Sequence, residues 1–203
     1  GTNFTAYLTP YNSFDSFQQT FQYAASFDDV ISIYNQCQND NAMPTSWERL
    51  KGYLTSKLAW NVDYDVEQLT EEFFEAYFGP AADTMRSVYD SYRVQAAFQN
   101  ETTYNGSRSI FHAALGTNGE TYWPKSLLQS WLDSMNAALD EIAYLENIDP
   151  ELYSAYEFNI KLERLSPIYM MIELYDDLLT DEELSSLKSQ FNEDVILTGI
   201  SRV

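Results

Sequence analysis

The chain has 203 residues, 45% of them hydrophobic, and its 31 acidic against 11 basic side chains give a formal net charge of −20. Such an acidic surface repels phosphate backbones, which argues against nucleic-acid binding. No apolar run approaches the roughly 18 residues of a membrane-spanning helix, so no membrane span is predicted, and the apolar content suffices for one globular unit.

Residues 1–44 carry the pattern of a strand, a helix and a second strand. Thr2–Thr9 alternates apolar and polar side chains, Asp15–Phe27 has apolar residues at helical spacing, and Val30–Tyr34 is a short β-branched run. A strand–helix–strand unit of this length is the building block of parallel sheets and barrels.

Residues 45–99 predict three helices that pack as a subdomain. Asp65 can cap the second helix, Gly79 supplies a left-handed residue at its end, and Pro80 suits the first turn of the third helix. Residues 100–123 are rich in Asn and Gly and predict a long loop. Residues 124–203 predict a helical hairpin or bundle, in which Pro167 kinks one helix.

One order of signals is specific enough to suggest a family. A helix reaches K-L-A-W at Lys57–Trp60, an acidic turn N-V-D-Y-D follows, and a second helix ends in F-F-E-A-Y-F-G-P-A-A at Phe73–Ala82. This order resembles an uncharacterised family of large bacterial proteins known as a domain of unknown function. The family is similar to glycoside hydrolases built on a TIM barrel, and distantly to α-glucuronidases and family-20 hexosaminidases. Val62 and Phe78 stand where the family's pattern often has Pro and Tyr.

The resemblance implies an architecture. Thr2–Tyr11 and Val30–Gln36 are similar to the family's final barrel strands, and the chain opens at Gly1 almost directly on a strand pattern. We therefore expect the C-terminal portion of a longer protein. Its fold class would be mainly α, a bundle-like array of about six to seven helices with a strand–helix–strand remnant of a TIM barrel at the N-terminus. The resemblance also implies export or a place at the cell surface.

Six residues are candidates for binding an oligosaccharide or polysaccharide. The carboxyl ends of barrel strands face the ligand, and amide and phenol groups suit sugar hydroxyls. Turn residues that satisfy backbone groups are the competing interpretation of the strand-end positions, and it is favoured. The predicted loop adds aromatic rings that could stack on pyranose rings. The candidates are Tyr11, Asn12, Asn35 and Gln36 at the strand ends, and Tyr122 and Trp123 in the loop.

A calcium loop is the weaker alternative for an acidic segment. Oxygen-bearing side chains fall at positions 1, 3, 5, 7 and 12 of an EF-hand pattern, but Val66 occupies the sixth position, where such loops need Gly. Helix capping explains the same side chains without an ion, so we predict no metal and no cofactor. The side chains are those of Asn61, Asp63, Asp65, Glu67 and Glu72.

These observations predict the C-terminal helical region of a carbohydrate-active, glycoside-hydrolase-like protein. We name no catalytic residue, because in related barrels the paired carboxylates come from earlier strands. The expected partner is the remainder of the parent barrel, without which the chain would not be catalytic. The alternative is a non-enzymatic helical module that binds glycans or another protein.

Overall fold

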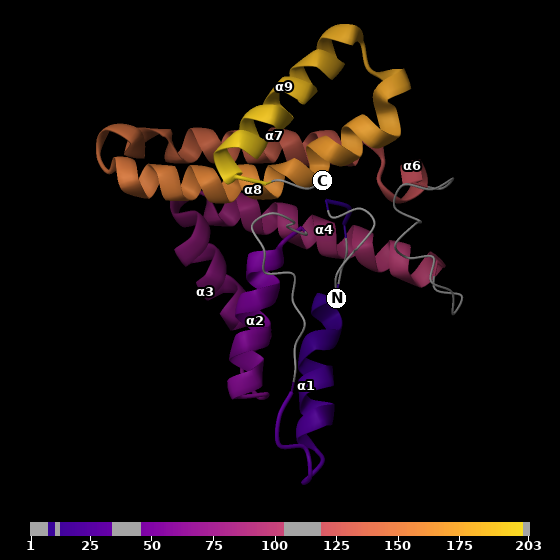
Figure 1. Ribbon diagram of the computed structural model, residues 1–203, viewed down its shortest axis with the longest axis vertical. Coiled ribbons are helices and arrows are strands. Elements are labelled where there is room, and N and C mark those ends of the chain that lie inside the picture. Colours follow the sequence, from indigo (N-terminus) through magenta and orange to yellow (C-terminus); the bar gives the residue numbers. More distant parts are fainter. Residues whose placement is uncertain (1–7, 11–12, 34–45, 104–118, 201–203) are drawn as a thin grey trace.

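The fold of this protein is mainly helical. The computed structural model describes residues 8–10, 13–33, 46–103 and 119–200, with the backbone alone for 100–103. Every regular element in these ranges is a helix (Figure 1). No helix in the described ranges combines the length and the apolarity that crossing a membrane requires.

The first half of the chain builds a group of shorter helices and one long one. Figure 1 shows α1, α2 and α3 side by side at one end of the molecule, with α4 lying across their tops. Three of these helices correspond to those predicted over residues 45–99. The elements are η1 (Phe14–Ser16), α1 (Phe17–Ala25), α2 (Glu48–Trp60), α3 (Val66–Phe78), η2 (Gly79–Ala81) and α4 (Ala82–Thr103).

The second half builds a long helical hairpin with a third helix crossing over it. The helices α7 and α8 lie side by side, and α9 rises away from them at one end (Figure 1). Pro167 lies within α8, which continues on both sides of it. The elements are α6 (Gly119–Tyr122), α7 (Lys125–Ile142), η3 (Ala143–Asn147), α8 (Pro150–Tyr175), η4 (Asp176–Leu178) and α9 (Asp181–Thr198).

Local signals in the sequence explain where several helices begin and end. The Asp65 side chain accepts hydrogen bonds from the N–H groups of Glu67 and Gln68, which caps α3. Gly79 follows α3 with φ 55°, in a region of backbone space that favours glycine. Thr180 and Glu183 form a complete capping box at the start of α9.

One hydrophobic core joins both halves of the chain. Its buried aromatic centre contains Trp47, Phe74, Phe78 and Tyr89, whose rings lie in edge-on or tilted contact. The same core continues through the buried faces of α7 and α8. The two halves are therefore packed together through a shared apolar interior.

The two predicted strands are not seen. Val30–Ile33 has no regular secondary structure and its side chains are exposed, and Leu8 and Thr9 lie in a turn. The remaining residues of both predicted strands, Thr2–Tyr7 and Tyr34, lie outside the described ranges. A strand needs a neighbour for its backbone N–H and C=O groups, and the described residues offer none, so β-branched composition alone does not produce one here.

The predicted loop at 100–123 is shorter than expected at both ends. The helix α4 extends to Thr103, and Gly119–Tyr122 forms α6. Residues 104–118 lie outside the described ranges.

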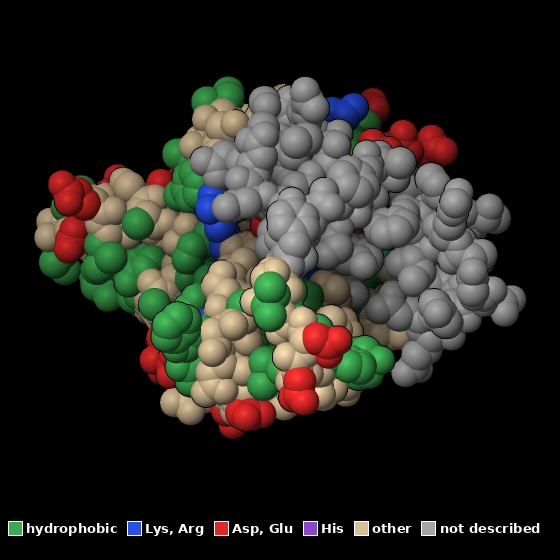
Figure 2. All heavy atoms as spheres, turned by 60° about the horizontal axis from the view of Figure 1, so that its bottom comes forward, with side chains coloured by type: hydrophobic (Ala, Val, Ile, Leu, Met, Phe, Trp, Pro, Cys, Tyr) green, Lys and Arg blue, Asp and Glu red, His purple; other side chains and the backbone are tan. Residues whose placement is uncertain are grey.

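Large hydrophobic side chains are exposed where α1 and α2 end. The loop after α2 is held against the side of α1 by Gln18 and Gln22, whose side-chain amides donate to the carbonyl oxygen of Val62. Figure 2, in which this end comes forward, shows hydrophobic and acidic side chains next to one another. We call this surface the α1–α2 tip, and it comprises Tyr23, Phe27, Val30, Ile31, Ile33, Trp60 and Tyr64.

Candidate functional site

Four of the six predicted glycan-binding residues lie outside the described ranges. They are Tyr11, Asn12, Asn35 and Gln36. Their role stays a prediction.

The other two, Tyr122 and Trp123, are buried rather than exposed. The Trp123 side chain is 0% exposed, stacks on Tyr92 with ring centroids 6.4 Å apart, and lies 6.0 Å from Trp131. The Tyr175 hydroxyl donates to the Trp123 carbonyl oxygen at 2.9 Å. Both rings belong to the buried hydrophobic core. The expected availability of these two rings for stacking on a sugar is therefore wrong.

The acidic segment after α2 uses its oxygens to order the backbone. Asn61 accepts a hydrogen bond from the N–H of Asp63, and Asp65 caps α3. Within the described part of the chain, no three His, Cys, Asp or Glu side chains come together as a metal site would require. Hydrogen bonds to the backbone therefore account for the oxygens of Asn61 and Asp65.

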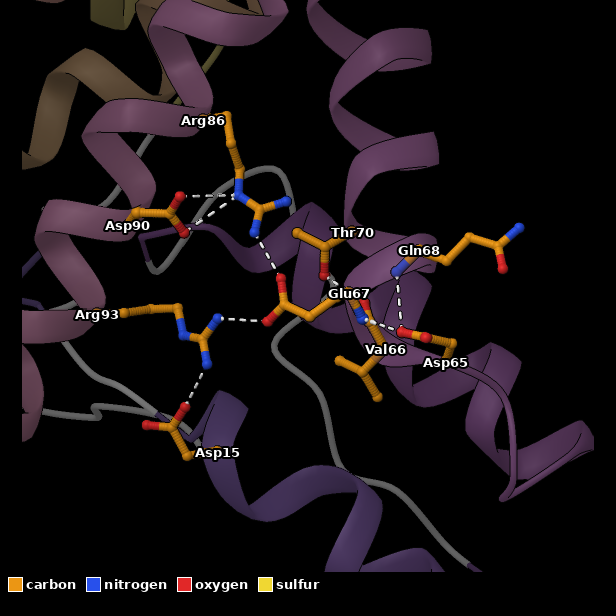
Figure 3. Close-up of polar contacts among 9 residues, drawn as sticks. All are labelled: Asp15, Asp65, Val66, Glu67, Gln68, Thr70, Arg86, Asp90 and Arg93. Carbon is orange, nitrogen blue, oxygen red and sulfur yellow. Dashed lines mark hydrogen bonds and ion pairs between the residues drawn. The ribbon is translucent and has the colours of Figure 1, made fainter.

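Glu67 belongs instead to an ion-pair network with α4 (Figure 3). Its carboxylate lies 2.6 Å from Arg86 and 3.0 Å from Arg93, and these arginines also pair with Asp90 and Asp15 at 3.1 and 2.7 Å. Burial would raise the pKa of Glu67, but hydrogen bonds from the two arginines outweigh it and lower that pKa. Because both arginine charges are met by carboxylates, the network holds η1, α3 and α4 together rather than offering an anion site.

A buried carboxyl group fixes the start of α2 on α8. Glu163 accepts a hydrogen bond of 2.8 Å from the N–H of Trp47, whose backbone is left-handed with φ 58°. Burial raises the pKa of Glu163 to about 7, against the Trp47 hydrogen bond and the charge of Lys51. Burial likewise lowers the pKa of Lys51 to about 8, while Glu163 and Glu48 act to raise it. A carboxyl group with a pKa near 7 could serve as a general acid in an enzyme. The Glu163 carboxylate, however, accepts a hydrogen bond from a backbone N–H, so we assign it a structural role.

Ser166, also buried on α8, extends this contact to the N-terminal segment. Its hydroxyl donates to the Leu8 carbonyl oxygen at 2.6 Å and lies 3.0 Å from the Ser46 hydroxyl. All three residues are buried. The cluster therefore attaches two separate N-terminal pieces to α8.

A second buried polar group joins the three C-terminal helices. Arg164 of α8 donates through Nε and Nη2 to both oxygens of Asp194 on α9, each at 2.8 Å, and through Nη1 to Oδ1 of Asn136 on α7 at 2.7 Å. Burial raises the pKa of Asp194, although Arg164 acts to lower it. This bidentate geometry fixes how α9 sits on α7 and α8.

An open groove lies between α7 and α9, beside this buried pair. Its volume is about 750 Å³. Its walls carry the polar side chains of Gln129, Asn136, Ser186 and Gln190, and the partly buried Leu179 and Leu187 supply apolar surface. Lys125, Thr180, Glu182 and Glu183 lie at the end formed by the start of α9. We call it the α7–α9 groove, and it is the candidate binding site.

The sequence interpretation missed this groove and the buried pair below it. Helical periodicity shows which side of each helix is apolar, but it does not show how far one helix splays from another. One signal was present, since Glu163 and Arg164 lie between two leucines, Leu162 and Leu165, in α8. Charges at such positions need partners from other elements, and those partners are far away in sequence.

Comparison with known proteins identifies only the first part of the chain. Residues 1–90 match the model of a family described as Domain of unknown function (DUF4838). No curated protein and no solved structure matches the chain. The match ends within α4, so it includes α1, α2 and α3 and leaves the α7–α9 groove outside. The predicted likeness to a domain of unknown function is confirmed to this extent.

Proposed function

We propose that this chain is the C-terminal helical region of a carbohydrate-active, glycoside-hydrolase-like protein, and that it hydrolyses no glycoside by itself. The observation that carries the proposal is the α1–α2 tip. Its exposed apolar surface supports packing against further polypeptide, which the resemblance suggests is the remainder of a barrel. Export or a place at the cell surface belongs to the same proposal.

The apolar composition of the α1–α2 tip supports the proposal that further polypeptide covers this surface. Ile31 is 96% exposed and Trp60 is 86% exposed. Single exposed apolar side chains are common, but a group of this size at one end of a molecule usually marks an interaction surface. Val30–Ile33 also has the β-branched composition of a strand, and such a run can pair with a strand edge supplied by a partner.

Helix positions agree with the order of segments on which the resemblance rests. The K-L-A-W motif at Lys57–Trp60 ends α2, and F-F-E-A-Y-F-G-P-A-A at Phe73–Ala82 spans the end of α3 and all of η2. Both motifs therefore lie at helix ends, as the resemblance to glycoside-hydrolase-like proteins implies. Both also lie within the residues that match the family model.

A non-enzymatic glycan-binding or protein-interaction module is the second candidate function. The α7–α9 groove favours it, because the groove is built from residues 125–190 and needs nothing outside the chain. The two functions are compatible, since many carbohydrate-active proteins hold glycans on surfaces separate from their catalytic face.

The decisive experiment extends the chain upstream of Gly1 with the sequence that precedes it in its gene. We expect further strand–helix units with a pair of strand-end Glu residues, and hydrolysis of an aryl glycoside by the extended protein. Ile31→Asp should destabilise the extended protein and leave the unfolding of the shorter chain nearly unchanged. Ile148→Asp is the matched control, because Ile148 is 73% exposed in the turn between α7 and α8. An upstream sequence without such units, or an Ile31→Asp effect no larger than that of the control, would refute the proposal.

The same proposal predicts no turnover by the chain alone. Hydrolysis needs two carboxyl groups about 5 to 10 Å apart in a cleft, held to within about 1 Å. The measurement is release of nitrophenol from a panel of aryl glycosides, compared with buffer. Turnover that survives purification and is abolished by replacing one Asp or Glu would show that the chain is itself an enzyme.

A further inference from the structure

We infer that the α7–α9 groove binds a neutral oligosaccharide. The inference rests on the proposed function for the carbohydrate class, and it assigns the binding to a surface that lies outside the residues matched by the family model.

The walls offer amide and hydroxyl groups that are not used elsewhere. Among the described residues, the side chains of Ser186 and Gln190 have no hydrogen-bond partner, and Gln129 uses only its Nε2, which donates to Asp133. An amide both donates and accepts, and so does a sugar hydroxyl, so the two are matched in kind. A sugar bound between the helices can therefore replace several hydrogen bonds that it makes with water.

Asn136 is held in one orientation by the buried pair. Its Oδ1 accepts from Arg164, which is itself fixed by two bonds to Asp194, so the oxygen of the amide is committed. Asn136 is exposed and lines the groove, which leaves its Nδ2 donors to a ligand. A donor held in advance costs less conformational entropy when it binds.

The charges at the groove favour an uncharged ligand. Lys125 donates to the Leu178 carbonyl oxygen at 3.2 Å, and Glu183 is used in the capping box of α9. Glu182 adds a further negative charge. With two carboxylates against one ammonium group, the site repels phosphate, sulfate and uronate groups more than it attracts them.

The apolar part of the surface suits the C–H face of a sugar ring. Leu187 of α9 and Leu179, just before α9, are partly buried and line the groove, while Leu132 of α7, which also lines it, is only 3% exposed. These are aliphatic rather than aromatic side chains, so the stacking contribution of a flat ring is absent from the groove walls. Together with the openness to water, this sets dissociation constants on the order of 1 mM.

The test is titration of the isotope-labelled chain with cellohexaose, xylohexaose and hexa-N-acetylchitohexaose, followed by amide chemical shifts. We expect shifts at α7 and at the first half of α9 with at least one of the three. Ser186→Ala, Gln190→Ala and Asn136→Asp should each weaken binding about fivefold, the effect of one lost hydrogen bond. Asn136→Asp keeps an acceptor for Arg164 and removes the donors, so it tests the ligand contact without breaking the buried cluster.

Asn192→Ala is the matched control, because Asn192 is exposed and two positions from Gln190, on the other side of α9. It should leave the affinity unchanged. Equal weakening by Asn192→Ala, or no binding of any of the three oligosaccharides, would overturn the groove assignment. Shifts confined to residues 11, 12, 35 and 36 would also overturn it, while supporting the carbohydrate function at the predicted strand ends. The proposed function is judged separately, by the extended protein.

Discussion

Two buried ionisable groups on α8 differ in how their charge is compensated. Arg164 meets a carboxylate with two hydrogen bonds, and Asp194 is fully buried. Glu163 has a backbone N–H as its direct partner and the Lys51 charge nearby. Removing one partner of the Arg164–Asp194 pair should therefore lower the free energy of unfolding strongly. The contribution of Glu163 to that free energy should instead depend strongly on pH.

Arg164→Ala should lower the free energy of unfolding by about 3 to 5 kcal/mol, because it leaves the Asp194 carboxylate buried without its counter-ion. Urea unfolding measures this. Arg86→Ala is the control, since Arg86 is partly exposed in the network around Glu67, and its loss should cost about 1 kcal/mol or less. Equal losses for the two variants would contradict the assigned role of the buried pair.

Glu163→Gln should change how stability depends on pH. The pKa of Glu163 is raised to about 7 from an ordinary 4.5, so between these values the folded protein holds a proton that the unfolded chain has released. The contribution of Glu163 to the free energy of unfolding therefore falls as pH rises through that window. Gln is uncharged at every pH, so the variant does not show this fall. The free energy of unfolding of Glu163→Gln should thus increase relative to that of the wild type as pH rises.

Urea unfolding of both proteins at several pH values between 4.5 and 7 gives this difference, because Lys51, whose pKa Glu163 acts to raise, titrates at about 8 and stays charged over most of this window. Glu173→Gln is the control, because Glu173 is exposed on the same helix. A difference that shrinks with rising pH would show that the carboxyl is stabilised in its charged form.

At the scale of single elements, local sequence signals were sufficient to predict helix ends but not strands. The cap at Asp65 and the stop at Gly79 were predicted from residue type, and the capping box at Thr180 follows the same kind of rule, because all three act through neighbours within a few residues. The strands over Thr2–Thr9 and Val30–Tyr34 were predicted on the same kind of signal. Their formation depends on a neighbouring strand, which residue type does not supply.

Gly79→Ala should be far more damaging than Gly199→Ala. Both glycines have positive φ, but a Cβ at Gly79 would collide with the ring of Tyr156 on α8, while a Cβ at Gly199 meets open space. Left-handed strain alone should cost Gly199→Ala about 1 to 2 kcal/mol. The collision and the less favourable backbone region should raise the loss for Gly79→Ala above about 2 kcal/mol.

Thermal and urea unfolding of the two variants provide the comparison. Tyr156→Ala combined with Gly79→Ala should recover part of the loss that is specific to Gly79. No recovery would show that the backbone conformation, rather than the contact with α8, sets the cost.

At the scale of the molecule, one core connects helices that the sequence suggested were separate subdomains. Trp47 and Phe74, within the residues matched by the family model, share a core with Trp131 and Met135 of α7. Buried polar contacts from Glu163 and Ser166 reinforce that connection. The matched and unmatched parts should therefore unfold together.

We expect far-UV circular dichroism and tryptophan fluorescence to report the same urea transition. Trp60→Phe removes the one strongly exposed tryptophan among the described residues, so that fluorescence reports Trp47, Trp123 and Trp131 in the core. Superimposable curves indicate a single cooperative unit. Two separate transitions would divide the protein near the predicted boundary at residues 100–123.

The sequence by itself determined the helical character, the ends of several helices and the acidic surface, because these depend on residue type and on spacing within a few turns. It also determined the likeness of the first 90 residues to a domain of unknown function. Only the tertiary structure decided that Trp123 is buried, that Arg164 pairs with Asp194 and that α7 and α9 enclose a groove. Each of these depends on contacts between residues tens of positions apart, whose geometry is set by how whole helices pack and not by the local pattern that forms them.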